Sequence, residues 1–502
     1  MTSMPFVRLN ESDNVLVALE PIAASTALGA GLTASQRIPR GHKIATEAIG
    51  PGGAVRKFGQ IIGFASKPIA RGEWVHEHNV ALHEFERDYT IEAQPARAPE
   101  PAAHFQGFRR ANGRVGTRNY IAILSSVNCA ATVARQIVRQ AERGGLLDDY
   151  PNIDGIVPLT HGTGCGMAAS GEGFETLERT LWGTACNPNI AAVLFVGLGC
   201  EVFQIARMKQ RYGISEGGAF RSMTIQDSGG TPATIAAGLA ALREMLPEAN
   251  AAAREPVPAS ELVLALQCGG SDAYSGLTAN PALGAAVDML VRQGGTAILS
   301  ETPEIYGAEH LLIRRAADRE VADALLARID WWRNYVGRTG DEMNNNPSPG
   351  NKAGGLTTIL EKSLGAVAKG GTVPLSGVYR YAETVDRHGL VFMDTPGYDP
   401  VSATGQVAGG ANMLCFTTGR GSAFGCKPVP SIKLATNSDL YRRMESDMDI
   451  DCGDILDGVS IEEKGRQIFA RLIEVASGSR TKSEQLGYGD NEFVPWQIGA
   501  VM

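Results

Sequence analysis

Near the N-terminus the apolar residues form short runs that are typical of β-strands. These strand-like runs are residues 14–19, 59–65 and 73–80. Gly/Pro-rich turns separate them, and a similar phrase occurs twice, at residues 38–42 and 69–73. The pattern predicts a small β-rich module over residues 1–92 with internal pseudo-repetition.

From about residue 108 the apolar residues form continuous runs, each followed by a small or polar turn and then a helix-like segment. The runs are residues 120–126, 191–197, 261–266, 296–300, 390–393 and 413–418. Such an alternation is typical of a parallel sheet covered by helices on both faces. A Pro/Ala-rich break at residues 251–259 predicts two α/β lobes, residues 108–255 and 256–502. Residues 93–107, rich in Pro and lacking apolar periodicity, are expected to be an extended linker. The predicted fold class is therefore α/β with mainly parallel sheets, preceded by a β-rich module.

Composition restricts the function classes. The chain has 502 residues, 44% hydrophobic and 20% charged, which is ordinary for a globular protein of several domains. Its net charge of −8 and the absence of a basic cluster argue against nucleic-acid or membrane-surface partners. The start of the chain lacks the pattern of a signal peptide, and the 8 cysteines are expected to be reduced thiols. We therefore expect a cytoplasmic protein that binds neither nucleic acid nor membrane.

Polar residues that directly follow the apolar runs are candidates for a site, because ligands bind beyond the carboxyl ends of parallel strands. The residues in such positions are Cys129, Cys200, Cys268, Asp272, Glu301, Asp394 and Arg420.

The segment from 346 to 355 is so rich in Pro, Gly and Asn that we expect a loop. It carries Lys352 and precedes a helix-like run at residues 358–367. Backbone donors and a cation before a helix are a suitable seat for an anion. The alternative is a plain surface turn.

Histidines and cysteines offer further candidates. His161 and Cys165 lie four residues apart in a Gly-rich loop, which suits a metal site or acid–base chemistry, although a cysteine is more often core filler. His42 lies in a turn beside a lysine, whereas His76 and His78 share one strand face or are surface residues. The chain has no CxxC pair and no phosphate-binding Gly motif, which argues against structural zinc and nucleotide chemistry.

Several long phrases resemble the altronate/galactarate dehydratase family over essentially the whole chain. They are residues 108–119, 197–201, 267–272, 346–355 and 417–421. The N-terminal module resembles the SAF domain that precedes the catalytic part in that family. The resemblance implies a hydro-lyase that removes water between C2 and C3 of a sugar acid, giving a 2-keto-3-deoxy acid, with Fe²⁺ or a similar divalent ion such as Mn²⁺.

This chemistry needs a base, an acid, a Lewis acid and cations at the substrate carboxylate. We expect the catalytic residues to be His42, His161, Glu201, Asp272 and Lys352. The expected substrate-binding residues are Asn351, Arg420, Lys433 and Ser271, and the expected metal ligands are His42, His161, Cys165 and Glu301. The rival mechanism is an Fe–S dehydratase with a cluster on Cys129, Cys165, Cys200 and Cys268.

The sequence favours D-altronate as the substrate. Residues 76–79 and 301–309 look more like altronate dehydratases, whereas residues 150–157 and 271–276 look more like galactarate dehydratases. Galactarate or another aldonate or aldarate is therefore the alternative, and a non-catalytic sugar-acid binding protein is the alternative from another class. We also expect a homo-oligomer, with a dimer as the first guess.

Overall fold

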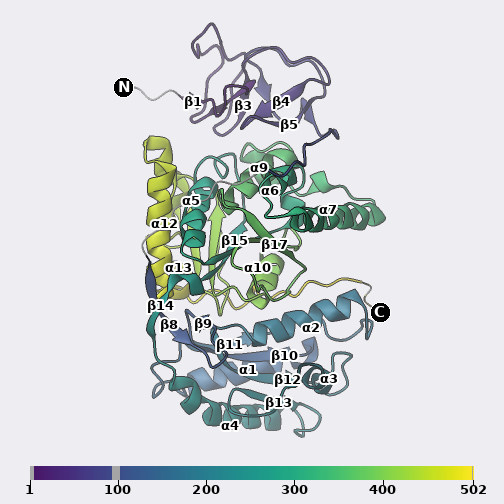
Figure 1. Cartoon of the computed structure of the whole chain (residues 1–502), viewed down its shortest axis with the longest axis vertical. Coiled ribbons are helices and arrows are strands. Elements are labelled where there is room, and N and C mark those ends of the chain that lie inside the picture. The colour runs from purple at the N-terminus through teal and green to yellow at the C-terminus, as the bar shows by residue number, and fades with distance from the viewer. Residues whose placement is uncertain (1–4, 93–101, 500, 502) are drawn as a thin grey trace.

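Three bodies stack along the long axis of the computed structural model, which describes residues 5–92, 102–499 and 501 (Figure 1). The N-terminal module is at one end, the lobe formed by the last half of the chain is in the middle, and the other α/β lobe is at the far end. The α/β lobe at the far end comes first in the chain and is called the first lobe. The lobe in the middle is called the second lobe. The arrangement confirms the predicted fold class, a β-rich module followed by α/β lobes with parallel sheets.

The N-terminal module consists of two antiparallel sheets, in the orders β1-β2-β3-β6 and β4-β5-β7. Its strands are β1 (Phe6–Val7), β2 (Val15–Ala18), β3 (Lys43–Ala45), β4 (Ala54–Lys57), β5 (Gln60–Ala65), β6 (Trp74–Val75) and β7 (Val80–Ala81). The prediction of one strand over residues 73–80 is wrong. The Asn79 side chain accepts from His76 N at 2.9 Å and donates to Trp74 O at 2.8 Å, which closes a turn between two short strands.

The first lobe is a four-stranded parallel sheet in the order β11-β10-β12-β13. Its elements are β10 (Tyr120–Ser125), α1 (Asn128–Arg143), β11 (Gly155–Leu159), α2 (Glu172–Ala185), β12 (Ile190–Gly197), α3 (Ile205–Tyr212), β13 (Phe220–Thr224) and α4 (Thr231–Asn250). Every residue of β10 is buried, because apolar clusters pack against both faces of the sheet.

The second lobe contains a seven-stranded parallel sheet in the order β17-β18-β16-β15-β19-β20-β21. Its strands are β15 (Val263–Cys268), β16 (Thr296–Ser300), β17 (Leu375–Tyr379), β18 (Gly389–Met393), β19 (Met413–Thr418), β20 (Ser431–Ala435) and β21 (Ile450–Asp451). Its helices are α5 (Ala279–Arg292), α6 (Glu309–Ile313), α7 (Arg319–Thr339), α8 (Pro349–Ala353), α9 (Ile359–Val367), α10 (Asp399–Ala408), α11 (Ser438–Arg443), α12 (Ile461–Ala476) and α13 (Lys482–Gln485). Within the described ranges, no helix has both the length and the apolar character needed to span a bilayer.

A small sheet and a buried arginine join the two lobes. Strands β8 (His104–Arg109), β9 (Val115–Gly116) and β14 (Glu255–Pro258) form this sheet in the order β14-β8-β9. Arg118, at the start of the first lobe, is buried and its Nε donates to Glu484 of the second lobe at 2.6 Å. The predicted linker, residues 93–107, falls largely on residues 93–101, outside the described residues, and its last residues belong to β8.

The segment at 346–355 is not entirely a loop, so that part of the prediction is wrong. Residues 349–353 form the short helix α8, because Pro349 fits the first turn and Ser348 caps it. The Ser348 and Asn351 side chains each accept from the other residue's backbone N–H, which is a capping box. The helix expected after it is present as α9.

Fully buried charges hold the N-terminal module on the second lobe. Glu361 of α9 accepts from the ammonium groups of Lys43 and Lys57, each at 2.8 Å, and Lys43 Nζ also donates to Gly355 O at 2.6 Å. Around this triad the two bodies touch closely. A side chain on Gly355, whose φ is +102°, would lie 2.4 Å from Gly41 O. The triad thus sits where close backbone contact excludes water.

Two lysines set the charge state of Glu361. Burial alone would raise the pKa of this carboxyl, but the ammonium groups of Lys43 and Lys57 hold its pKa far below the ordinary 4.5. Glu361 also accepts from Thr357 N at 3.0 Å. The first turn of α9 thus carries a carboxylate of the chain itself, which the two module lysines neutralise.

We expect Glu361→Gln to destabilise docking of the module by about 3–5 kcal/mol, because it leaves two buried lysines without a counter-charge. Since the folded pKa is depressed, the wild-type contribution is complete above about pH 4.5 and is lost as the pH falls below it. Urea unfolding at several pH values measures both effects. The matched control is Lys209→Met, which removes the partly exposed Lys209–Glu216 pair and should cost at most about 1 kcal/mol. Equal losses in the two variants would contradict the role of the triad.

Candidate active site

Charged groups gather where β15 and β16 end, on the edge of the large sheet that faces the N-terminal module. Cys268 is the last residue of β15, and Glu301 directly follows β16. Glu304 belongs to the short 3-10 helix after it, and Asp399 is the first residue of α10. We call the whole group the Cys268 cluster; its members are Cys268, Glu301, Glu304, Lys362, Lys369 and Asp399.

Two lysines reach the cluster from the segment that follows α8. Lys369 Nζ donates to Cys268 Sγ at 3.0 Å and lies 3.6 Å from Glu301 Oε2. Lys362 Nζ lies 2.7 Å from Glu304 Oε1 and donates to Asn346 Oδ1, also at 2.7 Å. Cys268, Glu301, Glu304 and Lys369 are almost completely buried. The lysine and glutamate charges of the cluster therefore pair with each other in a region that is shielded from water.

Burial moves the pKa values of the acidic groups apart. It raises the pKa of Glu301 well above its usual range, and the Glu304 carboxylate adds to that shift. Burial would also raise the pKa of Glu304, but the ammonium groups of Lys362 and Lys369 keep it below the ordinary value. Burial, followed by repulsion from Glu304, raises the pKa of Asp399 to about 7. The cluster thus holds a carboxyl that can exchange a proton near neutral pH.

Three members of the cluster could hold a metal ion. Ligand atoms of Cys268, Glu301 and Glu304 all lie within 4.8 Å of one another. Neither carboxylate oxygen of the buried Glu301 has a hydrogen-bond partner, although Lys369 pairs with it at longer range. A buried, incompletely satisfied carboxylate beside a thiol and a second carboxylate suits a divalent first-row transition ion.

Asp272 lies on the same edge, next to the junction with the module. It is buried, which raises its pKa, and it accepts from Thr436 Oγ1 and Ser275 Oγ, both at 3.1 Å. A cavity of about 10 Å³ is lined by Lys57 of the module together with Cys268, Asp272 and Lys362. This space is only large enough for about one water molecule.

Several of the predicted site residues come together here. Ser271, Asp272, Glu301 and Asn351 share this edge, and Asn351 Nδ2 donates to Ser271 O at 2.8 Å. His42 reaches the edge from the module, with its Nε2 3.4 Å from Ala353 O.

His42 and Lys352, two predicted site residues near the junction of α8 and the module, already have polar partners. Trp74 Nε1 donates to His42 Nδ1 at 3.1 Å, so both ring nitrogens of His42 have partners. Lys352 pairs with Glu77 of the module at 2.9 Å, and both side chains are partly exposed.

The two predicted substrate-binding cations are placed differently. Arg420 is exposed just beyond β19 and lies on the same edge, because a Cβ on Gly270 would be 3.1 Å from the Cβ of Arg420. Lys433 is buried within β20, where its Nζ donates to Ser422 O at 3.1 Å. Burial lowers the pKa of Lys433.

The remaining predicted residues are in the first lobe, at the carboxyl edge of its own sheet. His161 is buried with Nε2 2.9 Å from Ser125 O, and burial lowers its pKa to about 4, so the ring is neutral. Glu201 is buried and accepts from Gly199 N at 2.6 Å and from Ser126 Oγ. The predicted metal set His42, His161, Cys165 and Glu301 is therefore distributed over three bodies. Cys268 is likewise separated from Cys129, Cys165 and Cys200, because it belongs to the other sheet.

Sequence reasoning missed four members of the Cys268 cluster: Glu304, Lys362, Lys369 and Asp399. Only Asp399 carried a usable signal, since Asp-Pro after an apolar run often begins a helix at a strand end. Glu304 lies in the 3-10 helix after β16, whereas Lys362 and Lys369 reach the site through packing of α9 and the turn after it, which no spacing in the sequence reveals.

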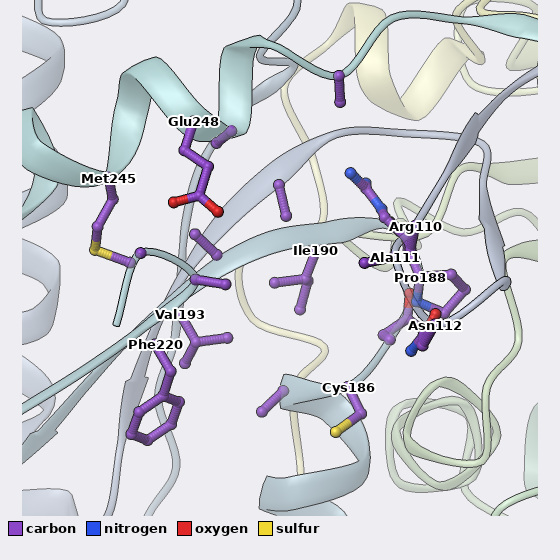
Figure 2. Close-up of a pocket in the computed structure, with 18 of the residues that line it drawn as sticks. Arg110, Ala111, Asn112, Cys186, Pro188, Ile190, Val193, Phe220, Met245 and Glu248 are labelled. Atoms are coloured by element: carbon purple, nitrogen blue, oxygen red, sulfur yellow. Dashed lines mark hydrogen bonds between the residues drawn. The ribbon is translucent and has the colours of Figure 1, made fainter. Parts of the chain in front are cut away.

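Another cavity, with a volume of about 440 Å³, lies at the opposite edge of the first lobe (Figure 2). Residues at the amino ends of β12 and β13 line it, together with α4 and the β8–β9 turn. Its lining is mainly apolar, and Arg110 donates to Pro188 O and Asn119 Oδ1, both at 2.7 Å. Glu248 and Arg110 line it from different sides (Figure 2), whereas acids and cations are paired in the Cys268 cluster, so we assign the active site to that cluster.

Comparison with known families matches nearly the whole chain. Residues 4–83 match the altronate/galactarate dehydratase SAF domain. Residues 107–250 match the second domain of D-galactarate dehydratase/altronate hydrolase, and residues 259–501 match the C-terminal domain of D-galactarate/altronate dehydratase.

Individual relatives are similar over comparable lengths. The chain is 36% identical to an altronate dehydratase of Bacillus subtilis, covering 96% of each protein. It is 39% identical to a galactarate dehydratase (L-threo-forming) of Escherichia coli, covering 96% of this chain and 95% of that one. It is also 35% identical to the (2R)-sulfolactate sulfo-lyase subunit beta of Chromohalobacter salexigens, over 78% of this chain and 96% of the relative.

The raised pKa of Asp399 predicts a specific pH dependence of stability. A carboxyl that binds its proton more tightly when folded contributes stability that is complete below the unfolded pKa of 3.8 and is lost as the pH rises through about 7. We expect Asp399→Asn to reduce the fall in Tm between these pH values. Thermal unfolding across that range measures it, with Asp323→Asn on an exposed helix face as control. Parallel curves for the wild type and Asp399→Asn would contradict the assignment.

Proposed function

The chain belongs to the D-galactarate/altronate dehydratase family, and on this premise we propose that it is a hydro-lyase that converts a sugar acid into a 2-keto-3-deoxy acid and water. The observation that carries the proposal is the Cys268 cluster, which places acid–base groups and cations on the edge that faces the SAF domain. The full-length match to dehydratases supports the same activity.

D-Altronate is the substrate that we propose first, and galactarate is the alternative. The relatives include an altronate dehydratase at 36% identity and a galactarate dehydratase at 39% identity, so overall identity does not separate the two. The choice of D-altronate rests on the phrases at residues 76–79 and 301–309.

The reaction needs a group that takes the C2 proton and positive charge where the enolate develops. Asp399 suits the proton transfer, because its carboxyl is only half-buried and its pKa is about 7. Lys362 and Lys369 are buried cations beside it that can stabilise the developing negative charge. Asp272, Ser271 and Asn351 lie where they can orient the acid. His42 of the module would close the site, together with Lys352 of α8, which pairs with Glu77 of the module.

We also propose that the enzyme depends on a divalent ion, Fe²⁺ or Mn²⁺, held by Cys268, Glu301 and Glu304. The donor atoms lie within reach of a common ion, and the unsatisfied oxygens of Glu301 fit such a ligand. A bound ion would supply Lewis-acid polarisation of the substrate carboxylate and the adjacent hydroxyl.

Substrate entry requires a change of shape at this junction. The cavity of about 10 Å³ cannot hold a six-carbon acid, so we propose that the SAF domain moves away from the second lobe during turnover. Closure then excludes water from the reacting groups.

We further propose a cytoplasmic location and a homo-oligomer, with a dimer as the first candidate. The eight cysteines are free thiols, which suits a reducing compartment.

A substrate panel tests the proposed activity. We expect the full chain, purified anaerobically and supplied with Fe²⁺ or Mn²⁺, to form a 2-keto-3-deoxy acid fastest from D-altronate. Galactarate, other aldonates and (2R)-sulfolactate complete the panel. Glu301→Gln should lower kcat at least about 10²-fold, because it removes a buried charged group from the site. Lys209→Met is the matched control and should keep wild-type kcat/KM. Absence of product from every acid would overturn the proposal, and fastest turnover of galactarate would replace the substrate.

A further inference from the structure

The exposed cysteines of the described chain are not scattered. Cys129, Cys165 and Cys200 are exposed, whereas Cys186 is half-buried and the four others are buried. Free cysteines are usually buried, so an exposed set needs an explanation. Each of the three follows a different strand of the first lobe: β10, β11 and β12.

These strands are neighbours, so the three cysteine loops meet at one edge. The sheet order is β11-β10-β12, and the strands are parallel, so their carboxyl ends lie together. Asn128 N donates to Thr163 O and Phe203 N donates to Gly164 O, both at 3.0 Å. These bonds join the loop of Cys165 to the other two loops close to each cysteine.

Glycine lets the loops approach closely. Gly164, next to Cys165, has a φ of +98°, and a Cβ there would lie 2.2 Å from Ser126 O. Gly199, next to Cys200, has a φ of +125°, and a Cβ there would lie 2.6 Å from Gln226 Oε1. A side chain at Gly164 would push its loop away from the backbone that leads to Cys129, whereas one at Gly199 would meet the side chain of Gln226.

Buried polar side chains hold the same loops in place through hydrogen bonds. The carboxylate of Glu201 accepts from Ser126 Oγ and from Gly199 N, and thereby joins the loop of Cys200 to the loop that leads to Cys129. His161 bonds to Ser125 O with one ring nitrogen and accepts from Thr163 N with the other. Both residues thus support the cysteine loops and have no free donor directed outward.

The spacing of the three thiols favours a cluster over a single ion. Around one tetrahedral zinc, with Zn–S bonds of about 2.3 Å, the sulfurs lie about 3.8 Å apart. Among the described residues, the one group with three ligand atoms within 4.8 Å of one another is that of Cys268, Glu301 and Glu304, so the three exposed thiols are spread more widely. A cluster of several irons bridged by sulfide holds its cysteine sulfurs farther apart than one zinc ion does.

We propose that Cys129, Cys165 and Cys200 bind an iron–sulfur cluster at the carboxyl edge of the first lobe. With three thiolates, one iron of a four-iron cluster has no cysteine ligand from this set and is open to an oxygen ligand. This site is separate from the Cys268 cluster, and its existence does not depend on the proposed dehydratase activity.

The test uses the full chain, purified anaerobically or reconstituted with Fe²⁺ and sulfide, and measures bound iron, acid-labile sulfide and visible absorption. We expect all three signals in the wild type. Cys129→Ser, Cys165→Ser and Cys200→Ser should each lose most of them. Because these side chains are exposed, the variants should have the same Tm as the cluster-free wild type.

Two matched controls define the site. Cys186→Ser changes a cysteine of the same lobe at the end of α2, beside the large cavity at the opposite edge of the sheet. Cys268→Ser changes the buried cysteine of the second lobe. Both should retain the acid-labile sulfide and the visible absorption, which an Fe²⁺ ion at the Cys268 cluster does not supply. Gly164→Ala, which touches no thiol but separates the loops, should lose the cluster.

Three results would overturn the proposal. In the first, the protein stays free of labile sulfide after reconstitution. In the second, it binds stoichiometric zinc without sulfide. In the third, Cys186→Ser or Cys268→Ser loses the cluster to the same extent as the three variants. Iron and sulfide are measured without substrate, so failure here leaves the sugar-acid assay unaffected, and the reverse also holds.

Discussion

The structure depends on one buried charge arrangement, the carboxylate of Glu361 between the ammonium groups of Lys43 and Lys57. Two charges come from the N-terminal module and one from the second lobe, so the triad exists only when the two bodies are docked. Removing charges from water costs free energy. Because the triad neutralises these charges only when the module is docked in this orientation, it favours this orientation over others. The docked module covers the carboxyl edge of the seven-stranded sheet, which carries the Cys268 cluster.

The two lobes use the same architecture for different chemistry. In each, parallel strands deliver polar residues to one edge, as expected for this class of sheet. In the second lobe that edge is covered and carries buried carboxylates and lysines. In the first lobe it is open and carries the exposed thiols. A covered edge suits proton transfer and charge stabilisation away from water, whereas an open edge suits assembly of an inorganic cofactor.

The continuous apolar runs predicted β10, β12, β15, β16, β18 and β19, because buried parallel strands leave a strong local pattern, but the sequence did not reveal β11, β13, β17, β20 and β21. The runs at residues 120–126 and 296–300 correspond closely to β10 and β16. Side-chain hydrogen bonds that form a helix in a Pro/Gly-rich segment were not predicted from the composition. The capping box of Ser348 and Asn351 turns part of a Pro/Gly-rich segment into a helix.

The candidate site could be predicted only in part. Strand-end positions pointed to Cys268, Asp272 and Glu301, which the structure places on one edge. Their partners Lys362 and Lys369 come from α9 and the turn after it, and only tertiary packing brings them near. Sequence spacing also could not separate His42, which belongs to the module, from His161 and Cys165, which belong to the first lobe.

The central claim is that the sugar acid binds between the SAF domain and the second lobe. Hydrogen–deuterium exchange of the full chain, with and without saturating D-altronate and with divalent ions withheld to prevent turnover, tests it most directly. The account predicts slower exchange in residues 268–276, 300–309 and 356–369 and in residues 40–58 of the module. Protection confined to residues 125–129, 160–166 and 197–203 of the first lobe would contradict it.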